Sequence, residues 1–402
     1  MNVYERFGVR TVINGSGTST RVGGALMPAE VVNAMSAAAL ESVSIVELQA
    51  AASRYIGQVT GAEAGYVTTG ASAGLTLGTA AILAKLDLGK MYRLPDTTGM
   101  KNEFIIAREQ RSGHDHAFRT AGARLIEVGM NEQVAVRGLR RTEAWEYTTA
   151  ITDRTAGIAY VATPGSQPPF EQVVEIAHRH DLPVLVDAAG QLPPRSNRRA
   201  FVDLGADLVT FSGGKAIRGP QSTGILCGRR EYVASAALQN LDTGEHFEIW
   251  DPPNDFIPKS SLSGIPREGI GRGFKVAKEE IIGLLTALKL FSEGGNDLDF
   301  EEQRQHLEYV VDGLSGLPVE PKMMTPEGEG CTLLHLVLDR EALGRSGFQV
   351  CLELKQGNPG VFLSEVLLAQ DTLVINPLNL NGPRTEALTH RLREVLAKRR
   401  DR

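Results

Sequence analysis

The sequence has few cysteines, no excess of basic charge and no long apolar run. Its three cysteines, Cys227, Cys331 and Cys351, form no Cys-x-x-Cys pair, which argues against a disulfide framework or a cysteine zinc site. The 42 lysines and arginines are outnumbered by 48 aspartates and glutamates, so the chain lacks the basic excess of a nucleic-acid-binding protein. No segment reaches the ~18 apolar residues of a membrane helix, and residues 1–11 lack the apolar core of a signal peptide. We therefore expect a cytoplasmic protein with no membrane or nucleic-acid partner.

The composition is that of a folded protein with more than one domain. Hydrophobic residues make up 42% of the 402 residues and charged residues 22%, which are ordinary values for a globular protein. At roughly 150 residues per domain, this length corresponds to two or three domains.

Between residues 60 and 230, short apolar segments alternate with segments of helical period. Several of the apolar segments consist almost wholly of Val, Ile and Leu, which is typical of strands covered on both faces. The alternation predicts a mainly parallel, doubly wound α/β sheet. The seven predicted strands are Ala64–Thr68, Glu103–Ala107, Arg124–Val128, Gly157–Ala162, Pro183–Asp187, Asp207–Phe211 and Thr223–Cys227.

The pattern changes after about residue 250. Residues 250–258 are rich in proline and turn formers, which excludes a continuous helix or central strand there. A long helix is predicted over 273–293, followed by strands near 331–338 and 372–376 and helices near 303–314 and 385–398. We expect three parts: an N-terminal arm and active-site loop (1–25), a large α/β domain (26–255) and a smaller C-terminal α+β domain (256–402).

Small residues follow the first predicted strand and open the helix after it. Residues 68–74 read Thr-Thr-Gly-Ala-Ser-Ala-Gly. Free N–H groups at a helix start favour an anion such as phosphate, so Gly70, Ala71 and Ser72 are candidate phosphate ligands. A tight turn with Ser72 as the helix cap fits the same residues.

Asp187 ends a wholly apolar predicted strand. A carboxylate buried in that position is costly unless a cation or several donors stabilise it. A protonated pyridine nitrogen is such a partner, and an aspartate facing it makes the ring a better electron sink. The alternative is that Asp187 caps a following helix.

Lys215 follows another predicted strand and two glycines, in the sequence Ser212-Gly-Gly-Lys215. A lysine becomes a Schiff-base nucleophile when its surroundings lower its pKa, because the neutral amine attacks the aldehyde. Ser212 and the two glycines allow the loop to pass close to a cofactor. A solvated surface lysine is the alternative, but the position after a strand, downstream of Asp187 and the candidate phosphate loop, favours the catalytic interpretation.

Together these motifs resemble the fold-type-I enzymes that use pyridoxal 5′-phosphate (PLP), and within them the selenocysteine synthase (seryl-tRNA(Sec) selenium transferase)-like family. The resemblance extends over almost the whole chain and is greatest to members described as D-glucosaminate-6-phosphate ammonia-lyases. Further segments that carry it are residues 12–18, 21–28, 47–49, 60–64, 115–117, 121–125 and 271–278.

The resemblance implies PLP as the cofactor, bound as a Schiff base at Lys215, with Asp187 at the pyridine nitrogen and phosphate contacts from residues 70–72. It also implies an active site completed across a homodimer interface. His116 best matches the ring that stacks on the pyridine, with a helix-capping histidine as the alternative. Ser212 and Gln191 are placed with the cofactor-binding residues.

Four residues are candidates for binding substrate. His114 lies two residues from His116, and Arg111 is a candidate ligand for an anionic group. Arg21 and Arg272 are candidates to clamp a phosphate or carboxylate. Lys275 and Lys278 fit this role or a solvated helix face equally well.

These residues predict a PLP-dependent lyase that performs α,β-elimination on a hydroxylated amino acid, with or without a phosphate, such as a sugar amino acid, releasing ammonia and a keto acid. An aminotransferase or a racemase of a small amino acid is the alternative, because each begins with the same loss of a proton. A selenium transferase is less favoured, because the resemblance begins within the first dozen residues, without the family's N-terminal tRNA-binding domain. A PLP-binding regulator lacks support in a basic helix, and no ligand cluster indicates a metal.

Overall fold

The computed structural model describes residues 2–130, 132–134, 138–294, 300–325 and 331–398. It divides into two compact units, which we describe separately. The large unit comprises Met27–Glu293, and the small unit comprises Met1–Leu26 together with Gly294–Arg402. No helix within the described residues is both long and apolar enough to cross a membrane.

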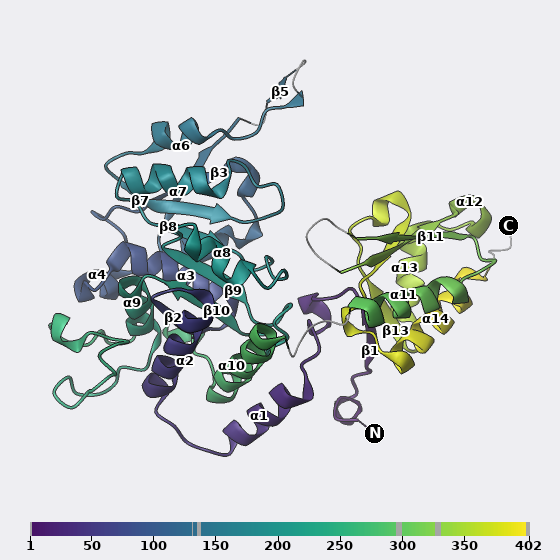
Figure 1. The fold of residues 1–402 in the computed structure, drawn as a ribbon, viewed down its shortest axis with the longest axis horizontal. Coiled ribbons are helices and arrows are strands. Elements are labelled where there is room, and N and C mark those ends of the chain that lie inside the picture. The colour runs from purple at the N-terminus through teal and green to yellow at the C-terminus, as the bar shows by residue number, and fades with distance from the viewer. Residues whose placement is uncertain (1, 131, 135–137, 295–299, 326–330, 399–402) are drawn as a thin grey trace. The chain divides into compact units, whose positions relative to one another are not determined.

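The large unit is built on a seven-stranded sheet in the order β2-β10-β9-β8-β7-β3-β4 (Figure 1). Its neighbouring strands pair in parallel except β10, which runs antiparallel to both β2 and β9. The strands are β2 (Ala64–Thr68), β3 (Glu103–Ala107), β4 (Arg124–Val128), β7 (Thr155–Val161), β8 (Val184–Asp187), β9 (Leu208–Ser212) and β10 (Gly224–Gly228). The predicted mainly parallel, seven-stranded sheet is confirmed.

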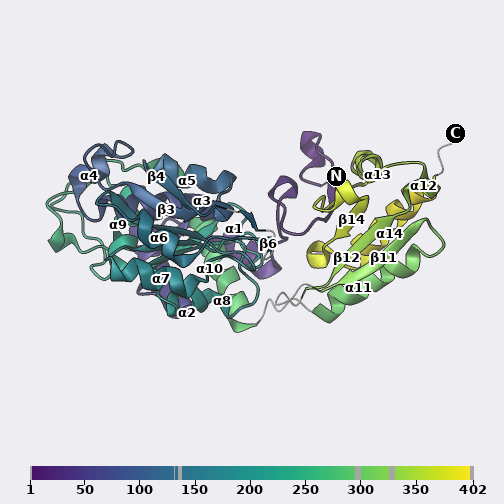
Figure 2. The same cartoon turned by 90° about the horizontal axis from the view of Figure 1, so that it is seen from above.

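Helices cover both faces of this sheet (Figure 2), as its alternating side chains require. Tyr66 of β2 joins one buried cluster, with Leu77 and Val233, whereas its neighbour Val67 joins the other, with Leu284. The helices of the large unit are α1 (Ala29–Ala39), α2 (Ile45–Thr60), α3 (Gly70–Ala84), α4 (Leu88–Arg93), α5 (His116–Thr120), α6 (Ala144–Ala150), α7 (Phe170–Arg179), α8 (Asn197–Asp203), α9 (Arg230–Asn240) and α10 (Lys278–Glu293). A short hairpin, β5 (Gln133–Val134) and β6 (Gly138–Leu139), lies outside the main sheet.

Helix α3 packs directly on the sheet because small residues face the strands. A Cβ atom on Gly74 would lie 2.5 Å from Oγ1 of Thr210, and one on Gly78 would lie 3.1 Å from Leu185. Larger side chains at these positions would lift α3 off the strands. The two glycines therefore allow α3 to lie close against β9 and β8.

The boundary between the units differs from the expected one. The sequence placed it after residue 255, whereas the large unit continues to Glu293. No helix or strand covers residues 250–258, as expected, but Trp250, Phe256 and Ile257 are buried in the core of the large unit. Helix α10 likewise contributes Ile281 to this unit's core. The turn-rich composition thus marks an irregular segment packed on the large unit, where we expected the end of a domain.

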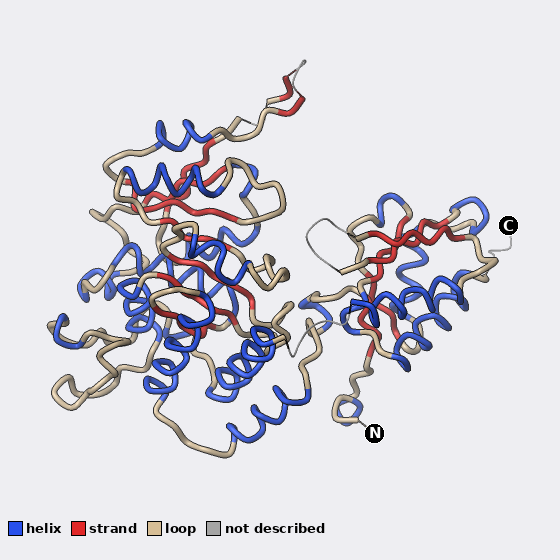
Figure 3. Tube along the Cα trace, viewed as in Figure 1, coloured by secondary structure: helices blue, strands red, loops and turns tan. Residues whose placement is uncertain are grey.

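The small unit is an α+β structure (Figure 3). Its three-stranded antiparallel sheet has the order β11-β12-β14, and a separate parallel pair joins β1 to β13. Through β1, residues 1–26 are part of this unit, whereas the sequence suggested a separate arm. The elements are β1 (Val12–Gly15), β11 (Val319–Met324), β12 (Leu333–Leu338), β13 (Gly360–Leu363), β14 (Thr372–Ile375), α11 (Phe300–Gly313), α12 (Arg340–Leu343), α13 (Gly347–Gln356) and α14 (Gly382–Leu396).

Short 3₁₀ helices complete the described structure. They span Glu5–Phe7, Thr20–Val22, Arg108–Gln110, Gly113–Asp115, Lys259–Ser261, Arg272–Phe274, Leu368–Gln370 and Pro377–Asn379.

Candidate active site

The three motifs meet at one edge of the large sheet. In register, Thr68 at the end of β2 lies opposite Gly224, which in turn lies opposite Ser212 at the end of β9. Asp187, the last residue of β8, lies opposite Thr210 of β9. This is the carboxyl edge of the parallel strands, where ligands bind in open α/β sheets.

The candidate phosphate loop forms the first turn of α3. Gly70 has a φ of +82°, which a residue without a Cβ adopts at little cost. The N-cap is Thr69, which makes no side-chain capping bond, and Ser72 is exposed. The expected alternative, with Ser72 as the cap, is therefore not observed. The N–H groups of this turn carry the partial positive charge of a helix start and suit an anion.

Strand β10 and Thr210 fix the position of this loop. A Cβ atom on Gly224 would lie 2.4 Å from the carbonyl carbon of Gly70 and 2.6 Å from the nitrogen of Ala71. Thr210 donates from Oγ1 to the carbonyl of Ala71 at 3.3 Å. The loop is thus held against β9 and β10, one strand away from Asp187.

Asp187 is a buried carboxylate without a cationic partner in the described part of the chain. Its side chain is 8% exposed, and its Oδ1 accepts a hydrogen bond of 3.0 Å from the N–H of Ala189. No α-helix begins directly after it, since α8 starts at Asn197, so it does not cap a helix. A buried carboxylate with one backbone donor leaves capacity for a bound cation.

Lys215 lies in the loop between β9 and β10 and is half-buried. Its Nζ would be 3.8 Å from a Cβ atom on Gly190, which places the amine beside the loop that follows Asp187. No carboxylate or other hydrogen-bond partner of this amine occurs among the residues that the structure describes. The amine is thus partly exposed and lies beside the loop after Asp187, so its catalytic role stays a prediction.

The two glycines before Lys215 are needed because the backbone of this loop passes close to residues 221–223. A Cβ atom on Gly214 would lie 2.5 Å from the Cα atom of Gln221, and Gly213 donates its N–H to the carbonyl of Thr223 at 2.8 Å. The loop therefore folds tightly back on itself. This compact turn presents Lys215 at the sheet edge.

Two further predicted residues lie at the same edge. Ser212 ends β9 and is half-buried. Gln191 donates from Nε2 to the carbonyl of Ala162, just beyond β7, at 2.8 Å. Its side-chain amide thus fastens the loop after Asp187 to the neighbouring strand.

His116 begins α5, and its neighbour Ala117 accepts a hydrogen bond of 3.0 Å from Thr76 of α3. This contact brings the start of α5 beside the phosphate loop. The rings of His116 and His114 are both exposed. His116 Nδ1 lies 3.2 Å from Nη2 of Arg119.

The arginines predicted to bind substrate make ion pairs in this structure. Arg111 donates from Nε to Asp115 at 2.5 Å and also pairs with Glu127; the hydrogen bond to Asp115 is the main cause that raises the pKa of Arg111. Arg21, in the small unit, donates to Glu365 at 2.6 Å. These carboxylates engage both guanidinium groups, and Asp115 is itself buried. Arg111 therefore orders the turn that carries His114 and His116.

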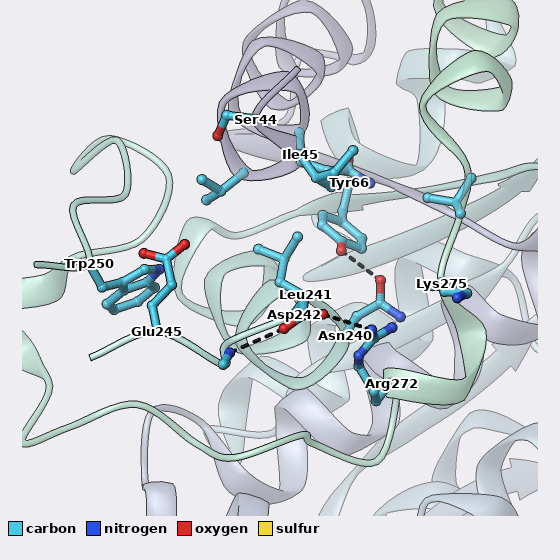
Figure 4. Close-up of a pocket in the computed structure, with 14 residues that line it drawn as sticks. Ser44, Ile45, Tyr66, Asn240, Leu241, Asp242, Glu245, Trp250, Arg272 and Lys275 are labelled. Carbon is cyan, nitrogen blue, oxygen red and sulfur yellow. Dashed lines mark hydrogen bonds and ion pairs between the residues drawn. The ribbon is translucent and has the colours of Figure 1, made fainter. Parts of the chain in front are cut away.

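Arg272 lines a cavity of about 610 Å³ at the side of β2 (Figure 4). It pairs with Asp242 at 2.8 Å. Lys275 lines the same cavity, whereas Lys278 donates to the carbonyl of Ala39 and pairs with Glu279. The sequence did not identify this cavity, because its walls come from four separate segments. They are residues 44–49, Tyr66, 240–250 and 272–276.

No group of three or more His, Cys, Asp or Glu side chains within the described residues is arranged to hold a metal ion. Cys227 of β10 does not supply an alternative nucleophile. Cys227 is fully buried, and burial raises the pKa of its thiol to about 12.

Comparison with known proteins decides the family. The family model for SelA, described as L-seryl-tRNA selenium transferase, matches residues 12–243, which is more than half of the chain. The chain belongs to this family. Its matched region contains the candidate phosphate loop, Asp187 and Lys215.

Two relatives of this SelA-family chain match it from end to end. A 5′-C-glycyluridine monooxygenase-decarboxylase from Streptomyces sp. is 29% identical over 98% of this chain and 92% of its own length. A D-glucosaminate-6-phosphate ammonia lyase from Salmonella typhimurium is 26% identical over 98% of both chains. The solved structure of a D-glucosaminate-6-phosphate ammonia-lyase covers the whole of both chains with a TM-score of 0.82 at 24% identity. The fold type and the classification as an enzyme of a PLP-dependent family are thereby confirmed.

Proposed function

We propose that the chain is a PLP-dependent lyase that releases ammonia from a hydroxylated α-amino acid by α,β-elimination. The observation that carries this proposal is the position of Asp187 and Lys215 at one sheet edge beside the N-terminus of α3. Within the part of the chain that the structure describes, the buried Asp187 has no cationic partner and Lys215 has no carboxylate partner. These groups match a cofactor with a basic ring nitrogen, an aldehyde and a phosphate.

The residues present fit PLP group by group. The first turn of α3 would hold the phosphate, with the N–H groups of Gly70, Ala71 and Ser72 as donors. Asp187 would accept a hydrogen bond from the protonated ring nitrogen. Lys215 would bind the aldehyde carbon through Nζ. The imidazole of His116 would cover the ring.

PLP, when bound, withdraws electrons from the α carbon of an attached amino acid. The residues of this chain supply the remaining functions. Lys215 Nζ, once released from the aldehyde and neutral, would take the proton from the α carbon of the substrate. Asp187 would keep the ring nitrogen protonated throughout, and its burial among apolar residues strengthens that charge interaction. Gln191 would hold the loop after Asp187 in place.

The substrate class follows from what the two long relatives are named for. D-glucosaminate is an α-amino acid with a hydroxyl on its β carbon, and 5′-C-glycyluridine joins an amino acid to a nucleoside sugar. We infer that the substrate of this chain is likewise an amino acid extended by a hydroxylated chain. Loss of the α proton and the β hydroxyl, followed by addition of water, gives a 2-oxo-3-deoxy acid and ammonia, so that all atoms balance.

The test is a product assay on the PLP-loaded protein with D-glucosaminate and its 6-phosphate. Release of ammonia and a 2-oxo acid in equal amounts is expected from at least one of them. Transfer of the amino group to the cofactor, without free ammonia, would instead identify an aminotransferase. A change of configuration alone would identify a racemase.

A second activity has a specific observation in its favour. The relative at 29% identity is named as a monooxygenase-decarboxylase, so we propose oxidative decarboxylation of a sugar amino acid as the alternative. Carbon dioxide release with consumption of oxygen, and no free ammonia, would establish this alternative over elimination.

A homodimer and a cytoplasmic location stay predictions. Exposed apolar side chains at the end of α1 and the start of α2, among them Leu40 at 85% and Val43 at 51% exposure, support a partner surface on the large unit. Analytical ultracentrifugation of the loaded protein tests the dimer, and a monomer at micromolar concentration would contradict it. Fractionation of the source cells tests the location.

A further inference from the structure

One hydrogen bond links the wall of the cavity beside β2 to the start of α3. Thr69, the N-cap of α3, donates from Oγ1 to the carbonyl of Phe274 at 2.9 Å. The next two residues, Lys275 and Val276, line the cavity, as does Arg272. A molecule bound at the start of α3 therefore has this cavity as its neighbouring space.

Some polar groups that line the cavity are already hydrogen-bonded to other groups of the protein (Figure 4). Tyr66 donates its hydroxyl to Asn240 Oδ1 at 2.7 Å, and Asn240 donates from Nδ2 to the carbonyl of Gly271 at 2.6 Å. Gln49 exchanges hydrogen bonds with the backbone of Val67. These groups form a fixed wall and leave ligand recognition to the charged side chains.

The cavity is lined by equal numbers of acidic and basic side chains. Asp242 accepts from Arg272 at 2.8 Å and from the N–H of Gly244 at 3.2 Å. Glu245 and Lys275 line the same space, and neither has an ion-pair partner among the described residues. The lining of the cavity thus contains two carboxylates and two cations. A dianionic phosphate would meet both carboxylates and would have to displace Asp242 from Arg272.

We propose that this cavity binds the uncharged, polyhydroxylated end of the substrate, and that the carboxylates of Asp242 and Glu245 select it over a phosphorylated end. This inference rests on the proposed function and narrows its substrate class. Carboxylates accept hydrogen bonds from hydroxyl groups, and Lys275 donates to them. The apolar parts of the wall, among them Ile45, Trp250 and Val276, fit the C–H faces of a sugar chain.

The experiment compares D-gluconate with 6-phospho-D-gluconate, two acids that lack the amino group and so test the cavity without the chemistry. Calorimetric titration of the PLP-loaded protein should show tighter binding of D-gluconate. Glu245→Gln should weaken D-gluconate about tenfold, the loss expected for a hydrogen bond to a charged group. Asp242→Asn should strengthen 6-phospho-D-gluconate about tenfold, because Arg272 loses its competing carboxylate.

Matched controls exist in the same segment. Glu248 and Asp251 are exposed and do not line the cavity, so Glu248→Gln and Asp251→Asn should leave both affinities unchanged. Equal or tighter binding of 6-phospho-D-gluconate to the unaltered protein, or no binding of either acid, would overturn the inference. Its failure is separable from that of the proposed function. Absence of ammonia from both D-glucosaminate and its 6-phosphate would refute the lyase, whereas a measured preference for D-gluconate would still stand.

Discussion

Lys215 faces Gly190 across the carboxyl edge of the sheet, with its Nζ 3.8 Å from where a Cβ atom of Gly190 would stand. The two residues belong to the loops that follow β9 and β8. A larger side chain at position 190 would occupy the space next to the amine. The glycine therefore leaves space beside Lys215, on the side of the loop after Asp187. A cofactor ring held by Lys215 and Asp187 would lie in this space.

Lys215→Ala should abolish turnover and the visible absorbance of covalently attached PLP, because it removes the amine proposed to hold the aldehyde. The absorbance spectrum after dialysis against PLP measures the attachment, and the ammonia assay measures the activity. Lys289 of α10 is exposed, and Lys289→Ala provides the control, with spectrum and activity unchanged. A yellow, active Lys215→Ala protein would refute the role of this lysine.

Asp187→Asn should retain bound PLP but lose most activity, because the neutral amide no longer stabilises a proton on the ring nitrogen. We expect kcat to fall by at least about a hundredfold, the scale seen when one charge-stabilising group is removed from an active site, with a smaller change in KM. Steady-state kinetics check this split. Asp203→Asn alters an exposed aspartate and should not affect either constant; unchanged kinetics in Asp187→Asn would rule out the assigned contact.

Gly224→Ala, a substitution in strand β10, should displace the candidate phosphate loop that packs against this strand. The added Cβ atom would lie 2.4 Å from the backbone of Gly70, a contact that only movement of the loop relieves. We expect weaker PLP binding and a loss of about 1–3 kcal/mol in the free energy of unfolding, as for other overpacked sites. Fluorescence titration with PLP and thermal unfolding measure the two effects. In Gly382→Ala the new atom meets nothing within 4 Å, so this variant should match the unaltered protein.

Most strands of the large sheet were predictable because burial on both faces leaves apolar runs in the sequence. The predicted and observed bounds agree for Ala64–Thr68 and Glu103–Ala107, in which every residue is buried, and also for the edge strand Arg124–Val128, in which only Val128 is buried. The motif residues follow strands of this kind. Their convergence at one edge then follows from the parallel arrangement, which brings the carboxyl ends of parallel strands together. The sequence could therefore assign Asp187 and Lys215 to the same edge of the sheet.

The remaining features depend on contacts between distant segments, for which the sequence carries no local signal. Strand β1 pairs with β13 near the other end of the chain, a contact that the local sequence does not indicate, so the sequence suggested a separate arm over residues 1–25. Arg111 and Arg21 have the residue type of substrate ligands, but the fold brings Glu127 to Arg111 and Glu365 to Arg21, and these carboxylates pair with their guanidinium groups. The cavity beside β2 combines Tyr66 with Asp242 and Arg272, and no spacing rule relates these positions.

Replacement of Glu365 in the small unit should change the free energy of unfolding by an amount that depends on pH. Lys355 and Arg21 both donate to its Oε1, at 2.5 and 2.6 Å, and these hydrogen bonds hold the pKa of the Glu365 carboxyl below its usual range. A lowered pKa in the folded state means that the pairing stabilises the fold above the unfolded value of about 4.3, and that this stabilisation is lost as the pH falls through the lower folded value. Because the groups are partly exposed, Glu365→Gln should cost at most about 1 kcal/mol at neutral pH. Thermal unfolding at neutral pH and at about pH 3 should show this cost shrinking toward acid. Glu386 is exposed, and Glu386→Gln should show no such dependence; a cost in Glu365→Gln that grows toward acid would contradict the lowered pKa.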